Sequence, residues 1–158
     1  MEPRINYAKI APGVVETMLG LSNYLRKSGL EESLLNLVHL RASQINGCAF
    51  CIDMHWKDLR AAGEEEQRSY GLGAWEESPY YSNRERAALA WTEAATNVQD
   101  GHVPDAVYQQ VRPFFSEKEL ADLTLAVVLI NGWNRLNISM RIVPGTYQPK
   151  ARELKKPA

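Results

Sequence analysis

Both cysteines of the chain lie in one short stretch, NGCAFCIDMH, at residues 46–55. Cys48 and Cys51 are three positions apart, and His55 follows Cys51 by four. On a helix, at about 100° per residue, the cysteines lie roughly 60° apart and Cys51 and His55 roughly 40° apart, so all three share one face. The first turn of a helix favours thiolate over thiol, and a neighbouring imidazole can take or return the proton. This spacing predicts thiol redox chemistry.

The two thiols have different predicted roles. Because His55 lies one turn beyond Cys51, Cys51 is the better candidate for the attacking thiolate, and Cys48 would resolve the product as a disulfide. A redox-active Cys48–Cys51 disulfide would be the reaction centre, and we expect no separate cofactor and no metal. Two cysteines are too few for a disulfide-built scaffold, so a disulfide in a reducing compartment is expected to be transient.

Other uses of paired cysteines fit less well. Structural zinc needs four ligands, usually as two spaced pairs, and the remaining histidines, His39 and His102, are not in a paired spacing. We interpret both as surface residues. Covalent haem attachment needs a histidine directly after the second cysteine, where Ile52 stands, and a thioredoxin-type site would follow a strand. The alternative left open is that Cys48 and Cys51 are small buried hydrophobic residues.

The segments around this stretch carry helical patterns. Apolar residues recur at helical spacing in residues 32–45, after which Asn46 and Gly47 interrupt the pattern and can cap the next helix. Ser116 and Glu119 form a predicted capping box at the start of a long apolar helix. We expect helices at residues 11–28, 32–45, 48–62 and 83–98, a short helix ending at residue 111, and a loop at residues 71–83. No segment alternates as a strand would, so the predicted class is all-α.

An internal similarity relates two parts of the sequence. A shift of 85 positions aligns Leu35 with Leu120, Leu40 with Leu125, and the tripeptide at residues 45–47 with that at residues 130–132. The similarity predicts two related helix-Asn-Gly-helix units, of which only the first carries cysteines. Coincidence between two apolar helices is the alternative, because only five positions are identical.

The composition indicates one globular domain. The chain has 158 residues, 45% of them hydrophobic, which fits a single domain over residues 1–145 and a basic tail, 146–158, that lies on the surface or frays. A net charge of −1, with both signs interspersed, leaves no basic stripe for nucleic acid. The amino terminus lacks the apolar block of a secretion signal, and the longest apolar run is too short to span a bilayer. We therefore expect a soluble, cytoplasmic protein.

The longest apolar run also bears on assembly. Residues 123–130, LTLAVVLI, are hydrophobic almost all round the predicted helix. Such a helix needs cover on more than one side, from the core of the domain, from a partner subunit, or from both. The run therefore predicts a homo-oligomer.

Three stretches, LRASQINGCAFCIDMH, RERAALAWTEA and INGWNRLNISMR, resemble the carboxymuconolactone decarboxylase-like family, and closely its alkyl hydroperoxidase D (AhpD) branch. The resemblance covers residues 5–143, and the Cys-x-x-Cys-x-x-x-His core after Asn-Gly is its most specific element. It implies an AhpD-like all-helical fold, assembly as trimers or hexamers, and thiol-dependent reduction of organic hydroperoxides. It also implies that Cys51 is the peroxidatic cysteine, Cys48 the resolving cysteine and His55 the relay histidine. A dithiol donor such as a lipoyl-carrying protein would then re-reduce the disulfide.

The sequence departs from the family pattern at one site residue. The family's relay carboxylate falls twelve residues before the first cysteine, where this chain has Asn36. Asn36 can hydrogen-bond to a water or to His55, but it cannot act as a base. Glu32, one turn earlier on the same helix face, and Glu93, in the alanine-rich helix at residues 83–98, are the two candidates to replace the carboxylate.

These features lead to two functional hypotheses. The first is a thiol peroxidase that reduces organic hydroperoxides through Cys51, Cys48 and His55. The second is a non-catalytic, redox-responsive oligomer or sensor that uses the same dithiol–disulfide switch. Asn36 keeps the second hypothesis open, because loss of the relay carboxylate matters less to a sensor than to an enzyme. The retained cysteine pair argues against the decarboxylase branch, whose reaction needs no dithiol.

Overall fold

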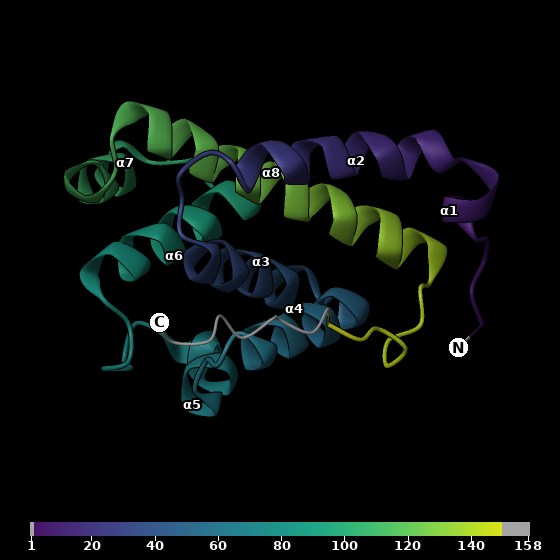
Figure 1. The fold of residues 1–158 in the computed structure, drawn as a ribbon. Helices are drawn as coiled ribbons and strands as arrows, with labels where there is room; N and C mark the ends of the chain where they lie inside the picture. The colour runs from purple at the N-terminus through teal and green to yellow at the C-terminus, as the bar shows by residue number, and fades with distance from the viewer. Residues whose placement is uncertain (1, 150–158) are drawn as a thin grey trace, which may run out of the picture.

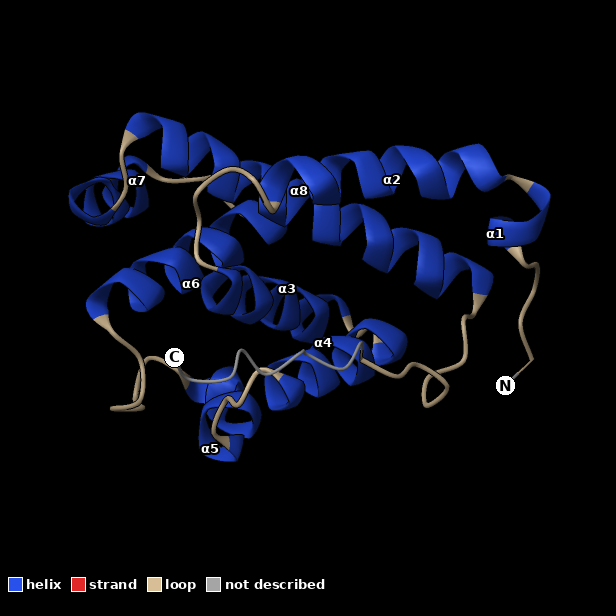
Figure 2. Cartoon of the chain, in the orientation of Figure 1, coloured by secondary structure: helices blue, strands red, loops and turns tan. Residues whose placement is uncertain are grey.

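The computed structural model describes residues 2–149 as a helical protein (Figure 1, Figure 2). Its α-helices are α1 (Tyr7–Ile10), α2 (Pro12–Leu25), α3 (Glu32–Asn46), α4 (Ala49–Ala61), α5 (Glu66–Tyr70), α6 (Asn83–Thr96), α7 (Asp105–Val111) and α8 (Glu117–Met140). Short 3₁₀ helices, η1 (Gly71–Ala74) and η2 (Arg112–Phe114), follow α5 and α7. Residues 2–149 contain no strand, which confirms the predicted all-α class. None of these helices has both the length and the apolar character needed to cross a lipid bilayer.

Helix α3 lies at the centre of the fold. It packs against α4, α6 and α8, and Figure 1 shows it between α8 and α4. Helix α2 in turn lies along α8. The apolar stripe predicted at residues 32–45 is buried by these neighbours: Leu34, Leu35, Leu37, Val38, Leu40 and Ala42. Because the helix that leads to the cysteines is covered on several sides, its end is held in a defined position.

Capping boxes begin α6 and α8. At α8, the Glu119 N–H donates to Ser116 Oγ at 3.2 Å, and the Ser116 N–H donates to a Glu119 carboxylate oxygen at 2.8 Å. The capping box predicted from the sequence is therefore confirmed. Ser82 and Glu85 form the equivalent pair at α6. Such pairs satisfy N–H groups that have no partner inside the helix, and from its cap α8 continues for 24 residues.

A tight turn joins α3 to α4 and sets the position of the cysteines. Gly47 ends α3 with a φ of 67°, in the left-handed region that favours glycine. The Cys48 N–H then donates to the Ser43 carbonyl at 3.0 Å. Contrary to the prediction, Asn46 and Gly47 close α3 and do not cap α4, because Cys48 is itself the N-cap residue of α4. Cys51 consequently lies in the first turn of α4.

The predicted second helix-Asn-Gly-helix unit does not form. Asn131 and Gly132 lie inside α8, which continues through them without a break. Gly132 permits close packing in place of a turn, since a Cβ atom there would lie 2.9 Å from Cε of Met18 on α2. The two equivalent asparagines nevertheless meet, because Asn46 Nδ2 donates to Asn131 Oδ1 at 3.0 Å.

The chain after α8 returns along α4. The Lys57 ammonium on α4 donates to the carbonyls of Gly145 and Tyr147, at 3.3 Å and 3.1 Å. These bonds hold the chain around residues 146–149, the start of the predicted tail, against α4. The remainder of that predicted tail, residues 150–158, lies outside the described residues.

Candidate functional site

The structure brings Cys48, Cys51 and His55 together at the start of α4. Cys48 is the N-cap residue, Cys51 lies in the first turn, and His55 lies one turn further on. All three are buried, with exposed fractions of 1%, 0% and 7%. Both cysteines are free, and their Sγ atoms lie 2.7 Å apart, so a disulfide can form after a small movement. Within residues 2–149, no group of three or more His, Cys, Asp or Glu side chains is placed to hold a metal ion.

The two thiols differ in acidity. The Cys48 thiol donates to Cys51 Sγ, and this hydrogen bond is the main cause that lowers the pKa of Cys51 to about 7, against the opposing effect of burial. The same hydrogen bond, together with burial, raises the pKa of Cys48. The N–H groups at the start of α4 add a partial positive charge near Cys51. Cys51 is therefore the more easily ionised sulfur, and Cys48 is its proton-bearing partner.

Two asparagines of α8 also bear on the sulfurs. Asn137 Nδ2 donates to Cys51 Sγ at 3.3 Å. The amides of Asn137 and Asn134 both lower the pKa of Cys51, after the larger effects of Cys48 and burial. Sequence reasoning missed them because Asn137 lies 86 positions beyond Cys51. A signal was present in the sequence, since asparagines recur every three residues, at 131, 134 and 137, in an otherwise apolar helix.

A set of hydrogen-bonded polar side chains, which we call the polar seam, joins α3 to α8. It consists of Ser43 and Asn46 on α3 and Asn131 and Asn134 on α8. Asn134 Nδ2 donates to Ser43 Oγ at 3.0 Å, and Asn46 Nδ2 donates to Asn134 Oδ1 at 2.8 Å. Ser43 and Asn134 are buried, and Asn46 and Asn131 are partly buried, so these hydrogen bonds help to fix how the two helices lie against each other. The polar seam thereby helps to set the position of the α8 amides relative to the sulfurs.

His55 lies against a second imidazole, that of His39 on α3. The two ring centroids are 5.0 Å apart. Burial, and secondly the charge of His39, lower the pKa of His55 well below its usual range, so His55 is neutral at neutral pH. His39 Nε2 and both ring nitrogens of His55 are buried without a hydrogen-bond partner in residues 2–149. Contrary to the expectation of a surface position, His39 is partly buried with its Nε2 enclosed, and burial lowers its pKa to about 4.

The predicted relay position and the first candidate carboxylate both lie on α3. Asn36 stands three residues before His39 and is partly buried. Because residues three apart on a helix share a face, a group at position 36 points to the same side as His39. Glu32 begins α3 and is exposed. Burial raises the pKa of Asp58 on α4, and the negative charge of Glu32 raises it further. The Glu32 carboxylate therefore lies close enough to Asp58 to interact with it electrostatically.

Glu93, the second candidate carboxylate, belongs to a different cluster. Arg41 Nε lies 2.8 Å from Glu93 Oε1, and Trp75 Nε1 donates to the same oxygen at 2.6 Å. Trp75 packs in one apolar cluster, whereas the two sulfurs pack in another with Ile130 of α8. The structure therefore groups Glu93 with Arg41 and Trp75, and this contact ties α6 to α3.

Known proteins resemble this chain over most of its length. The model of the carboxymuconolactone decarboxylase family matches residues 12–94, just over half of the chain. The uncharacterized protein YdfG of Bacillus subtilis (strain 168) is 43% identical over 140 residues, which are 89% of this chain and 95% of YdfG. The uncharacterized protein YnjA of Escherichia coli (strain K12) is 30% identical over 117 residues, which are 74% of this chain and 64% of YnjA. The matched region thus spans slightly less than two thirds of YnjA.

Solved structures share the fold. A protein of unknown function from Agrobacterium tumefaciens, ATU0492, described as a candidate antioxidant defence protein AhpD, is 41% identical with a TM-score of 0.89, over 92% of this chain and 100% of that chain. An uncharacterized peroxidase-related protein from Ralstonia eutropha JMP134, described as an alkylhydroperoxidase AhpD core, is 17% identical with a TM-score of 0.74, over 88% and 74% of the two chains. The debrominase Bmp8 is 18% identical with a TM-score of 0.76, over 85% and 73%. By its family match and its relatives, this chain belongs to the carboxymuconolactone decarboxylase family, among the AhpD-like proteins.

Proposed function

We propose that this protein is a thiol-dependent peroxidase that reduces organic hydroperoxides. The observation that carries the proposal is the hydrogen bond from Cys48 to Cys51, with the sulfurs 2.7 Å apart at the first turn of α4. This contact favours a thiolate at one sulfur near neutral pH and holds the second sulfur within reach of it. Membership of the AhpD-like proteins supports the same class of chemistry.

The proposed reaction has two steps at the sulfurs. The Cys51 thiolate attacks the terminal oxygen of the hydroperoxide, the O–O bond breaks, and the alkoxide leaves with the electron pair and is protonated to the alcohol. Cys51 is thereby oxidised to a sulfenic acid. The Cys48 sulfur then attacks the Cys51 sulfur, hydroxide leaves as water with the proton of the Cys48 thiol, and a disulfide forms. A dithiol reductant restores both thiols and is itself oxidised to a disulfide.

In the proposed reaction, His55 moves the proton of Cys51. It lies one helical turn beyond Cys51 and is neutral, so a ring nitrogen carries a lone pair that can accept this proton. The imidazolium so formed then protonates the leaving alkoxide. Burial disfavours the charged imidazolium, which favours return of the proton within the same step.

The surroundings of the sulfurs favour an apolar peroxide. Phe50 and Trp133, both partly buried, pack against the cluster of Cys48, Cys51 and Ile130. Because Cys51 is fully buried, a substrate reaches it only when covering side chains move, and it then contacts these aromatic rings. Buried apolar surface contributes about 25 cal/mol per Å², so a carbon chain gains free energy here that a small polar peroxide does not. Organic hydroperoxides are therefore the proposed substrates.

The proposal includes a location and partners. A reducing cytoplasm would return Cys48 and Cys51 to thiols between turnovers. The proposed reductant is a dithiol such as a lipoyl-carrying protein, and the proposed assembly is a trimer or hexamer, as the resemblance to the AhpD branch implies. Neither nucleic acid nor a membrane is a proposed partner.

A turnover assay tests the proposal. Reduced protein is mixed with an organic hydroperoxide and excess dihydrolipoamide, and formation of the alcohol is followed over time. We expect turnover by the wild type and none by Cys51→Ser. In a parallel reaction without dihydrolipoamide, Cys48→Ser should react once and leave an over-oxidisable sulfenic acid. Full peroxidase activity in Cys51→Ser would exclude the proposal. Thiol oxidation in the wild type no faster than that of free cysteine would also exclude it.

A second candidate function is a redox-responsive oligomer without peroxidase turnover. The observation that favours it is Asn36 at the relay position, while the candidate replacement Glu93 is held by Arg41 and Trp75. In that case the disulfide would change packing or assembly and would not serve turnover. Sedimentation of the reduced and the oxidised protein tests this function, and a change in assembled mass without turnover supports it.

A further inference from the structure

The amino-terminal segment docks on the end of α8. The Arg4 N–H donates to the Met140 carbonyl at 3.0 Å, and the Arg4 guanidinium donates to the Ser139 carbonyl at 3.0 Å. Figure 1 shows α1 beside the carboxyl end of α8. From α1, Tyr7 Oη donates to Asn137 Oδ1 at 2.8 Å. The segment therefore brings a phenol hydroxyl to the α8 side chain that contacts the reactive sulfur.

The Tyr7 hydroxyl and Cys51 Sγ contact opposite ends of the Asn137 amide. The phenol hydrogen needs an acceptor, and in this pair the acceptor is the amide oxygen. The amide nitrogen is then turned toward Cys51 Sγ, 3.3 Å away. Without the hydroxyl, the amide is free to flip, and its oxygen would then face the sulfur and repel a thiolate. Asn137 and Cys51 are 5% and 0% exposed, and electrostatic differences are larger in such buried surroundings than in water.

The groups around Cys51 and its neighbour His55 come from four parts of the chain. The turn and α4 supply Cys48 and His55, α3 supplies His39, α1 supplies Tyr7, and α8 supplies the neutral amides Asn134 and Asn137. Burial raises the pKa of Tyr7, and the charges of Cys51 and Cys48 raise it further, as expected for a phenol near the sulfurs. Tyr7 therefore stays protonated, and remains a donor, while Cys51 ionises.

We propose that Tyr7 and Asn137 are positioning residues for the nucleophile: Tyr7 holds the Asn137 amide so that its N–H donates to the Cys51 thiolate. This role adds positioning residues to the proposed peroxidase site, and its use in catalysis rests on the proposed peroxidase function. Ionisation of Cys51, however, can be measured without any peroxide. The role also places α1, a helix that the sequence patterns did not predict, in the functional site.

The rate of Cys51 alkylation by iodoacetamide as a function of pH tests this role. Reduced full-length protein is alkylated between about pH 5 and pH 10, and the modified cysteine is identified by mass spectrometry. At pH 6, below the pKa of Cys51, we expect Tyr7→Phe to lower the rate about fivefold, the effect of one hydrogen bond. Asn137→Asp keeps the shape but places a carboxylate against the sulfur, so it should lower the rate about tenfold or more. At pH 10 both variants should match the wild type, because Cys51 is then ionised in all of them.

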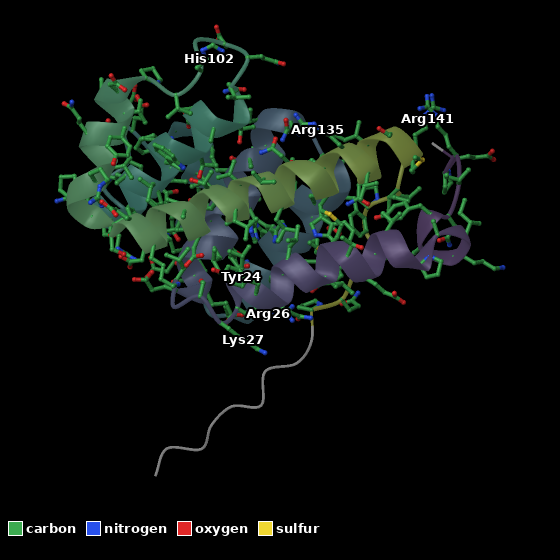
Figure 3. All side chains as sticks on the ribbon, turned by 90° about the horizontal axis from the view of Figure 1, so that it is seen from above. Tyr24, Arg26, Lys27, His102, Arg135 and Arg141 are labelled. Carbon is green, nitrogen blue, oxygen red and sulfur yellow. The ribbon has the colours of Figure 1, made fainter. Side chains whose placement is uncertain are left out.

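Tyr24→Phe is the matched control. The Tyr24 hydroxyl also donates to an α8 side chain, Asp122, at 2.9 Å, but Tyr24 lies at the end of α2 remote from α1 (Figure 3). Its pH profile should equal that of the wild type. A Tyr7→Phe profile equal to that of Tyr24→Phe would overturn the role, and so would an equal loss of rate at every pH, which indicates a structural defect. If Tyr7→Phe does not fold, Asn137→Leu decides, because it removes the amide donor without adding a charge: a profile shifted to higher pH supports the role, and an unshifted profile overturns it.

Alkylation separates this role from the proposed function. A shifted profile in a protein that does not reduce hydroperoxides would keep the positioning role and refute the peroxidase. An unshifted profile in a protein that turns over normally would refute the positioning role and keep the peroxidase.

Discussion

At the scale of single residues, the partner of His55 separates this chain from the family pattern. Where the resemblance places a carboxylate, the chain has Asn36, and α3 presents His39 with its ring centroid 5.0 Å from that of His55. A carboxylate would stabilise the imidazolium form, whereas burial and His39 lower the pKa of His55. His55 therefore holds the proton of Cys51 weakly, and oxidation should be slower than with a carboxylate in place.

Asn36→Glu should consequently raise the rate of Cys51 oxidation. A carboxylate on this face of α3 raises the pKa of His55 toward its ordinary value, because the negative charge favours the imidazolium. General acid–base catalysis is typically worth ~10²–10⁴-fold, so partial restoration should give about a tenfold increase. Stopped-flow measurement of thiol loss with an organic hydroperoxide near pH 7 checks it. Asn36→Gln is the neutral control of equal size, and equal rates for the two variants would show that His55 needs no carboxylate.

Among the helices, an interaction could be predicted from the sequence when its two residues lie close together along the chain, and not when they lie far apart. The capping box of Ser116 and Glu119 lies within one turn, and its residue types predicted the start of α8 correctly. The bond between Asn137 and Cys51 joins positions 86 apart, and no local pattern specifies which asparagine meets which thiol. Helix α1 was missed for a related reason, since its four residues are too few for a periodic signal.

The dipeptide Asn-Gly shows how surroundings override local sequence. At residues 46–47 it ends α3, with Gly47 in the left-handed region. At residues 131–132 the same dipeptide lies within α8, where Met18 of α2 packs against Gly132. Local sequence alone therefore predicts a break at both places, and packing against a neighbouring helix distinguishes them. Only the break at Gly47 is needed to place the cysteines at a helix start.

Substituting alanine for glycine at two positions should change stability in opposite directions. Gly47→Ala forces a residue with a Cβ atom into the left-handed region and should lower the free energy of unfolding by about 1–2 kcal/mol. Gly20→Ala, in exposed surroundings within α2 and with open space around its Cβ, should raise it by about 0.5–1 kcal/mol. Urea unfolding of both variants measures the differences. If Gly47→Ala does not lower the free energy of unfolding, the structure of the turn between α3 and α4 is contradicted.

At the scale of the whole molecule, the fold alone does not determine the reaction. The debrominase Bmp8 and the peroxidase-related protein of Ralstonia eutropha match this chain with TM-scores of 0.76 and 0.74, at 18% and 17% identity. Proteins with different described activities thus share one helical framework. The features that distinguish this chain lie in its site: the two sulfurs, the His39–His55 pair and the α8 amides.

The predicted oligomeric state can also be tested, through the apolar surface of α8. The core of the protein buries Leu123, Val127 and Ile130 of the long apolar run, but leaves Val128 57% exposed. We expect a trimer or hexamer in sedimentation experiments, with apolar α8 surface covered by a partner subunit. Val128→Lys should reduce the assembled mass, because a charge buried without a partner is unfavourable. A wild type that stays monomeric at micromolar concentration would contradict this prediction.

Trapping of the first oxidised intermediate most directly tests whether Cys51 attacks the peroxide and Cys48 resolves the product. Reduced Cys48→Ser protein is mixed with one equivalent of an organic hydroperoxide and then with dimedone, and the adduct is located by peptide mass spectrometry. We expect a dimedone adduct on Cys51, and none on Cys48 when Cys51→Ser is treated in the same way. An adduct on Cys48 in Cys51→Ser with equal yield, or no adduct on Cys51 in Cys48→Ser, would contradict the assignment.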